Sequence, residues 1–370
     1  MATVETTTVS WGSRLGSSIK GVLFGFFLFI IGFPVLFSNE GRAVATTKTN
    51  EEGAATVVEA AAGSIDPAQE GMLVHVVGEA TTQDVLTDSE YGVSATAIRL
   101  SREVEMYQWV ENSETREEKK LGGKVEQVTT YTYTKEWCSS AINSDSFKET
   151  DKINPPARRE LGDSSIYAKD VTLGVRKLND EQIRSIGRSE KLLVKYQPVT
   201  TNEFFEVSGT VPEPRIGDIR VTYTVVRPHV VTIVAAQAGS SFMAYTARST
   251  RKSISHVMDG SIDAAGVFAA AERSNSIITW LVRIGGFLLM FFGLSSILKP
   301  ISVLADVLPI LGDIVEMGTG LVAGLVALIC ALVTIAIAWL FYRPVLGILL
   351  LLAAGFLAWK LYQKRKAKHA

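Results

Sequence analysis

Glu103 and Glu105 are the residues whose type and spacing come closest to a catalytic pair. They stand two apart in a segment rich in β-branched and aromatic residues, so both carboxylates would lie on one face of a strand. A general acid–base pair requires one carboxyl group to be desolvated in a pocket. We favour the simpler interpretation, in which both form the charged outer face of a strand. With His75, they would otherwise suit an enzyme that acts on lipid or peptidoglycan.

Other catalytic and ligand-binding patterns are missing from the sequence. The four histidines do not stand at metal-ligand spacing, and there is no HExxH, CxxC, GxSxG, Walker A or GxGxxG motif. Cys138 lies in a polar region and Cys330 in an apolar run, so we do not expect them to pair. A net charge of -1 gives no field that would attract nucleic acid. We therefore expect no catalytic residue, no cofactor, no metal site and no nucleic-acid partner.

Long apolar runs near both ends of the 370-residue chain predict membrane-spanning helices. Their lengths suit a hydrocarbon core of roughly 30 Å. The predicted spans are residues 21–37, 277–298, 321–342 and 344–362. A cleaved signal peptide is the alternative for the first run, because Ala43-Val44-Ala45 resembles a cleavage site.

Basic flanks predict the orientation of these spans. Arg14 and Lys20 in the N-terminal tail (1–20) precede the first span, and a basic tail (363–370) follows the last. Because positive residues favour the cytoplasm, both termini are expected to be cytoplasmic. Residues 38–276 would then form an extracytoplasmic domain, in the periplasm or in the lumen of the endoplasmic reticulum or nuclear envelope.

Two sets of charged residues lie in or near the predicted spans. Arg283, close to Trp280, is interpreted as a side chain that snorkels to the membrane interface, with a charge inside a pore as the alternative. Asp306, Asp313 and Glu316 share one side of a helical wheel within residues 299–320. We expect that segment to be an amphipathic piece on the cytoplasmic leaflet, divided by its two prolines, Pro300 and Pro309. A re-entrant loop with an acidic, ion-binding lining is the alternative.

Glycines mark two further features. Pairs spaced four apart open the first and third spans and predict close helix packing or oligomerisation. These pairs are Gly21 with Gly25 and Gly320 with Gly324. After the first span, Asn39, Glu40, Gly41 and Arg42 predict a junction, in which Gly41 permits a tight bend and its charged neighbours bond to the base of the domain.

The region between the first two spans is predicted to be rich in β-structure. Period-two patterns indicate strands at 72–80, 104–110, 128–137, 219–226 and 230–236. The charged stretch 111–124 would be the tip of one hairpin, and Arg227-Pro228 the turn of a second. Residues 43–63 read as a linker or weakly helical stalk, Asn179 would cap a helix over 179–191, and Ser261 would cap a helix before the second span. The fold class is therefore an α+β membrane protein with four transmembrane helices and a large β-rich extracytoplasmic domain.

Several short sequence motifs occur in the order and spacing that are typical of a known family. They include Asn39-Glu40-Gly41-Arg42-Ala43, Val104-Glu105-Met106-Tyr107-Gln108-Trp109, Gly217-Asp218-Ile219-Arg220-Val221, Arg273-Ser274-Asn275-Ser276 and Trp339-Leu340-Phe341-Tyr342-Arg343-Pro344. Over roughly residues 20 to 360 the sequence resembles the LUMA (transmembrane protein 43) family. The resemblance implies four spans, a large lumenal or periplasmic domain and no catalytic residues.

Eukaryotic members of that family look like scaffolds of the endoplasmic reticulum and inner nuclear membrane. The resemblance implies self-association and binding of partners such as lamins and emerin, or an inner-membrane location if the chain is bacterial. Our first hypothesis is a non-enzymatic scaffold that lies in the lipid bilayer as a homo-oligomer and organises membrane or envelope proteins. An ion channel or channel-modulating oligomer is the second hypothesis, and the enzyme described above is the third.

Overall fold

The computed structural model describes residues 3–155, 162–194, 203–205, 213–307 and 309–345. The chain forms two compact units. A β-rich unit comprises Met1–Glu5, Thr49–Thr115 and Thr129–Ala270, and a helical unit comprises Thr6–Lys48, Arg116–Val128 and Ala271–Ala370.

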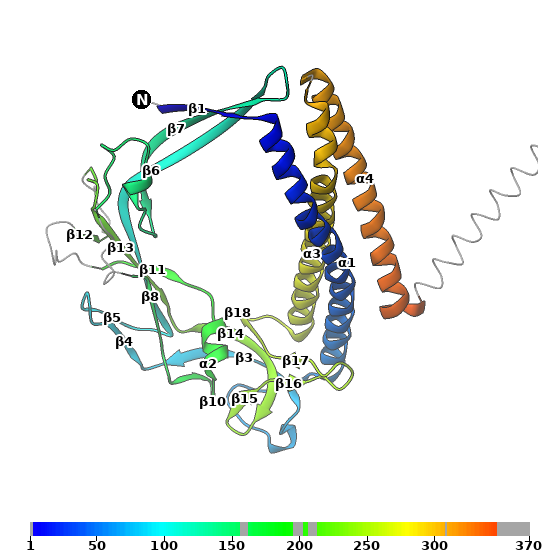
Figure 1. Ribbon diagram of the computed structural model, residues 1–370. Coiled ribbons are helices and arrows are strands. Elements are labelled where there is room, and N and C mark those ends of the chain that lie inside the picture. Colours follow the sequence, from blue (N-terminus) through cyan, green and yellow to red (C-terminus); the bar gives the residue numbers. More distant parts are fainter. Residues whose placement is uncertain (1–2, 156–161, 195–202, 206–212, 308, 346–370) are drawn as a thin grey trace, which may run out of the picture. The chain divides into compact units, whose positions relative to one another are not determined.

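Three long helices dominate the helical unit: α1 (Trp11–Thr56), α3 (Ala264–Ala305) and α4 (Pro309–Tyr342). They lie side by side (Figure 1). Each is long and apolar enough to cross a membrane, so the described residues hold three candidate spans. Residues 346–362 of the predicted fourth span lie outside the described residues.

The helices extend well beyond the predicted spans. Helix α1 continues to Thr56, because Ala, Lys and Glu residues after position 42 favour a helix, and Pro34 does not end it. The expected bend at Gly41 is therefore wrong. Helix α3 includes Pro300, and α4 begins at Pro309, where proline suits a first helical turn. Residues 299–320 are thus the end of α3 and the start of α4 rather than two separate short helices. The side chain of Asp263, not Ser261, accepts from the backbone N–H of Gly266 at the start of α3.

Two seven-stranded sheets make up most of the β-structure. The first has the order β1-β7-β6-β13-β11, with β12 on β13 and β8 on β6. Its strands are β1 (Thr3–Val9), β6 (Arg99–Lys119), β7 (Val125–Cys138), β8 (Ser164–Tyr167), β11 (Glu190–Leu192), β12 (Glu203–Phe205) and β13 (Ile219–Val226). Strand β13 alternates buried and partly exposed residues at its start, as the period-two pattern predicts.

The second sheet closes on itself, because β14 pairs with both β15 and β3 along the order β18-β14-β15-β10-β9-β3-β2. Its strands are β2 (Val58–Glu59), β3 (Leu73–Thr82), β9 (Val171–Leu173), β10 (Arg176–Lys177), β14 (His229–Ala238), β15 (Ser241–Met243) and β18 (His256–Asp259). The remaining short elements are β4 (Val85–Asp88), β5 (Val93–Thr96), β16 (Tyr245–Thr246), β17 (Ser253–Ile254), α2 (Asp180–Ser185) and the 3-10 turns Pro67–Gln69 and Ser144–Ser146. One hydrophobic cluster contains residues of both sheets, including Val104, Val221, Val76 and Ile233.

The predicted hairpins are only partly correct. Strands β6 and β7 form the first hairpin, but the charged stretch continues the strands to Lys119 instead of forming a long tip. Strands β13 and β14 have nearly the predicted bounds, yet they belong to different sheets, so the second hairpin does not exist. Helix α2 has the predicted Asn179 cap but ends at Ser185, because residues 190–192 pair with β13 as a strand.

Candidate functional site: a polar cluster between the helices

Seven side chains of the helical unit form a polar cluster where α1, α3 and α4 meet. They are Asn39, Glu40 and Arg42 of α1, Asn275, Thr279 and Arg283 of α3, and Trp339 of α4. Three of the sequence motifs described above each supply part of this cluster; they are residues 39–43, 273–276 and 339–344. We call these seven residues the polar cluster.

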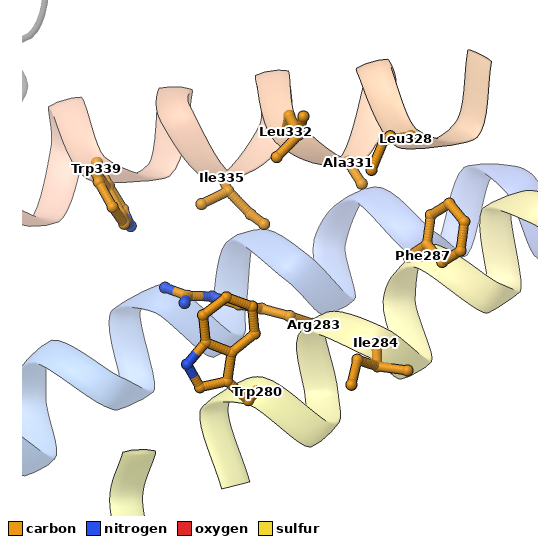
Figure 2. Close-up of a pocket in the computed structure, with 9 residues that line it drawn as sticks. All are labelled: Trp280, Arg283, Ile284, Phe287, Leu328, Ala331, Leu332, Ile335 and Trp339. Atoms are coloured by element: carbon orange, nitrogen blue, oxygen red, sulfur yellow. The ribbon is translucent and has the colours of Figure 1, made fainter. Parts of the chain in front are cut away.

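Glu40 is the centre of the cluster and its side chain is 1% exposed. The guanidinium of Arg283 donates to both carboxylate oxygens, from Nε at 2.7 Å and from Nη2 at 2.9 Å. The indole Nε1 of Trp339 donates to the same carboxylate at 2.8 Å. The guanidinium also lies over the ring of Trp280, 4.9 Å from its centroid (Figure 2). Arg283 is therefore one half of a bidentate ion pair rather than a free snorkelling side chain.

Arg42 and Asn275 extend the contact between α1 and α3. Arg42 donates to the side-chain oxygens of Asn275 at 3.0 Å and Thr279 at 2.8 Å. Asn275 donates from Nδ2 to the carbonyl oxygen of Ala43 at 3.1 Å, and Asn39 donates to the carbonyl oxygen of Thr279 at 3.0 Å. Side chain and backbone bonds thus run in both directions across the helix pair, which fixes their register.

The sequence spacing explains how α3 presents these groups. Asn275, Thr279 and Arg283 are four apart, so they lie on one face of the helix. Polar groups at a membrane-spanning contact are costly unless they bond to one another. The spacing was a usable signal for Asn275 and Thr279, but it becomes specific only when the matching residues of α1 are known.

Glycines let the helices approach closely at other points. A Cβ on Gly25 would lie 2.6 Å from the carbonyl oxygen of Gly293, and a Cβ on Gly41 would lie 2.6 Å from the ring of Tyr342. Of the other glycines singled out in the sequence, Gly324 has ordinary contact with Phe291, while nothing lies within 4 Å of a Cβ on Gly21 or Gly320. Gly41 therefore serves close helix packing within a continuous helix.

The acidic residues near the start of α4 face cations of the same unit. Lys119 at the end of β6 pairs with Asp306 at 3.0 Å, Asp313 at 2.9 Å and Glu316 at 2.6 Å. Arg14 pairs with Asp306 at 2.5 Å. Burial lowers the pKa of Lys119, but hydrogen bonds to the three carboxylates outweigh burial and raise the pKa above its ordinary value of 10.5. These carboxylates are thus occupied by a lysine, and in the described part of the chain no group of three or more His, Cys, Asp or Glu could hold a metal ion.

These ion pairs bear on the predicted orientation. Lys119 belongs to residues 38–276 and Asp306 to residues 299–320, which the charge pattern assigns to opposite sides of a membrane. Lys119 and Asp306 cannot be in direct contact if a bilayer separates them.

The three candidate catalytic residues are not brought together. Glu105 accepts from Arg220 at 2.6 Å, and Glu103 is exposed on the same strand, β6. His75 lies on β3 of the other sheet, with Nδ1 2.7 Å from Glu59 Oε2 and Nε2 2.8 Å from the carbonyl oxygen of Ile262. Each of the two bonded residues has a partner in its own sheet or in a loop, and the two residues lie on different sheets.

Apolar helices joined by a buried polar cluster, together with a large β-rich unit, define a membrane protein. The chain belongs to the Transmembrane protein 43 (LUMA) family, whose sequence profile matches residues 106–344. It is 33% identical to human Transmembrane protein 43 over 356 residues, which cover 91% of this chain and 88% of the relative. It is 28% identical to the Drosophila melanogaster homolog over 346 residues, covering 90% and 92% of the two chains. No solved structure matches the chain.

Proposed function

We propose that this protein is a non-enzymatic membrane scaffold that organises membrane or envelope protein complexes through self-association and partner binding. The observation that carries the proposal is the closed Glu40–Arg283–Trp339 contact. It uses the charged side chains to join helices, which suits a rigid anchor for the β-rich unit.

An ion channel is the second candidate, because Arg283 and the acidic residues of α4 are charges in or near apolar helices. A conducting pathway needs polar groups that face an open lumen. Arg283 is engaged by Glu40, and the hydroxyl of Thr334 donates within its own helix to the carbonyl oxygen of Cys330 at 2.7 Å. The scaffold accounts for these contacts more directly than the channel does.

The proposed arrangement in the membrane follows the charge pattern. Four spans would leave both termini in the cytoplasm and most of the β-rich unit on the other side. The membrane would be that of the endoplasmic reticulum and the inner nuclear membrane in a eukaryote, or the inner membrane in a bacterium.

The full chain, purified in native-lipid particles, tests the proposal. We expect a particle mass that contains more than one chain, together with membrane proteins that are absent from a control purification of an unrelated multi-pass protein with the same tag. A single chain without such partners would refute the scaffold. Reproducible single-channel currents from the reconstituted chain, lost in an Arg283→Met variant but kept in Arg273→Met, would favour the channel.

A further inference from the structure

Strand β7 lies between β1 and β6 in the first sheet, so it becomes the edge of that sheet wherever β1 is absent (Figure 1). Residues 128–134 of β7, VTTYTYT, include no charged residue, proline or glycine. Charged side chains, proline and bulges are the features that usually prevent pairing at a sheet edge. β-branched and aromatic residues favour extended backbone. This part of β7 is therefore suited to accept a further strand.

Three side chains beside β7 recognise the strand that β7 holds in the structure. Tyr131 and Lys148 both contact Oε2 of Glu5, the phenol hydroxyl at 3.1 Å and the ammonium at 2.8 Å. Glu149 accepts at 2.7 Å from the hydroxyl of Thr3. Thr3 and Glu5 are two apart, so they lie on one face of β1. We call Tyr131, Lys148 and Glu149 the edge triplet, and it binds a hydroxyl and a carboxylate at alternate positions of an extended strand.

Contacts that do not involve β1 hold the edge triplet in place. The backbone N–H of Lys148 donates to Glu111 Oε2 at 2.7 Å. The backbone N–H of Glu149 donates to the hydroxyl of Tyr133 at 3.0 Å, and that hydroxyl donates to Glu111 Oε2 at 2.6 Å. The ring of Tyr133 also contacts Phe147, with 5.9 Å between the centroids. The edge triplet is thus preformed, which lowers the cost of binding a strand.

The four-span arrangement proposed above separates β1 from the edge triplet. It places residues 1–20 in the cytoplasm, whereas residues 129–270, which contain the edge triplet, belong to the β-rich unit on the other side of the membrane. The N-terminal tail of a second copy would also be cytoplasmic, so another protein must supply the strand.

We propose that, in the membrane, this edge of β7 binds an extended segment of a partner membrane protein. The segment adds a strand to the first sheet and carries a hydroxyl and a carboxylate two residues apart. Backbone bonds to β7 supply affinity, and the edge triplet supplies specificity. The proposal rests on the proposed scaffold function and names the surface through which the scaffold holds a partner.

A peptide with the sequence of residues 2–10, ATVETTTVS, is the probe. It carries fluorescein, and its anisotropy measures binding to the full chain in lipid nanodiscs, which expose both membrane faces. We expect Lys148→Glu to weaken binding about tenfold or more, because an attractive pair becomes a repulsive one. A peptide with Glu5→Lys should regain affinity for that variant. Lys169→Glu is the matched control, because Lys169 is an exposed lysine of the β-rich unit outside the edge triplet.

Backbone methylation distinguishes strand pairing from attraction between charges. Successive N–H groups of a strand point to opposite sides, so only one side faces β7. One peptide is N-methylated at Thr3 and Glu5, and a second at Val4 and Thr6. We expect one of the two to lose binding and the other to keep it. Equal binding of the two peptides, or equal effects of Lys148→Glu and Lys169→Glu, would overturn the proposal.

Cross-linking tests whether the chain's own tail leaves the edge free. Thr3→Cys and Glu149→Cys are combined with Cys138→Ser and Cys330→Ser, and a short membrane-permeant thiol cross-linker is added to sealed membranes. We expect no cross-link within the chain, and an efficient one would overturn the proposal. Absence of peptide binding by a chain that forms oligomeric, partner-bound particles would refute the docking edge alone. Peptide binding by a chain that forms single-chain particles without partners would refute the scaffold alone.

Discussion

At the scale of single residues, the ion pair between Glu40 and Arg283 offers the sharpest test of the polar cluster. Arg283→Met leaves the carboxylate of Glu40 buried without its cation, and the hydrogen bond from the indole of Trp339 is retained. Breaking a buried ion pair on one side costs roughly 3–5 kcal/mol. We expect a clear fall in the thermal midpoint of the chain in lipid particles, measured by intrinsic fluorescence.

The double variant Glu40→Gln with Arg283→Met distinguishes charge from shape. It removes both charges and keeps an oxygen that can accept from Trp339, so we expect part of the lost stability to return. Arg273→Met is the control, because Arg273 is an exposed arginine of the same helix. If the Arg283→Met variant has the same thermal midpoint as the native chain, the ion pair does not hold the helices together.

His256 in β18 gives the β-rich unit a pH dependence. Its Nε2 is buried and has no hydrogen-bond partner among the described residues, and its ring contacts Phe268 edge-on. Burial lowers the pKa of His256 below its ordinary value of 6.5. As the pH falls below 6.5 the unfolded state binds a proton that the folded state does not, so the free energy of unfolding decreases until the pH reaches the lower folded pKa.

We expect His256→Leu to lose this part of the pH dependence, which is at most about 1.4 kcal/mol per pH unit for one group. Urea unfolding of both proteins at pH 7.5 and pH 5.5 measures the difference. His75 and His229 are present in both proteins, so their contributions cancel in the comparison. Identical changes with pH in the two proteins would contradict the assignment to His256.

The sequence allowed only part of the polar cluster to be foreseen. Glu40, Arg42 and Arg283 stand out because charges beside apolar runs are costly. Their partnership could not be foreseen, since Glu40 and Arg283 are separated by the whole β-rich unit and many pairings satisfy the same rule. Trp339 has an ordinary interpretation as an interfacial aromatic residue, and only the fold shows that its indole bonds to Glu40.

At the scale of elements, local sequence patterns predicted where strands occur better than they predicted which strands pair. The bounds of β13 and β14 follow from period-two alternation within each strand. Their assignment to different sheets depends on β6 and β3, the distant strands with which they pair. The start of α3 at Ala264 agrees with the helix predicted before the second span, and the continuation of α1 to Thr56 agrees with the helical alternative for residues 43–63. The start of α1 at Trp11 and the end of α3 at Ala305 were missed, because hydropathy detects only the apolar part of each helix.

The close approach of α1 and α3 can be tested with two glycines of one motif. Gly25→Val places a side chain against the backbone of Gly293, so the helices must separate, and overpacking of this kind costs about 1–3 kcal/mol or more. Gly21→Val meets open space and is the matched control. We expect lower yield of monodisperse protein and a lower thermal midpoint for the first variant alone. Equal behaviour of the two variants would show that the contact does not limit stability.

At the scale of the whole molecule, two physical effects compete over residues 116–128. The pairs of Lys119 join this hairpin tip to Asp306, while four spans require a bilayer between them. The carboxylates of Asp313 and Glu316 are exposed, and exposed ion pairs contribute about 0–1 kcal/mol each. Asp306 is buried, so the cost of desolvation offsets much of its attraction to Lys119. A two-stranded ribbon that entered the bilayer would leave edge N–H and C=O groups unsatisfied, at several kcal/mol each. In a membrane, we therefore expect the crossing of residues 21–37 to prevail over the ion pairs.

Labelling of single cysteines with an impermeant maleimide in sealed vesicles measures the outcome. Ser13→Cys reports the N-terminal tail, Glu79→Cys the β-rich unit and Leu121→Cys the hairpin tip, and all three positions are exposed. We expect Leu121→Cys to react from the same side as Glu79→Cys and from the side opposite to Ser13→Cys. If Leu121→Cys is instead labelled from the same side as Ser13→Cys, the ion pairs of Lys119 persist in the membrane. The apolar run of α1 would then not separate the tail from the tip, and the four-span arrangement would be wrong.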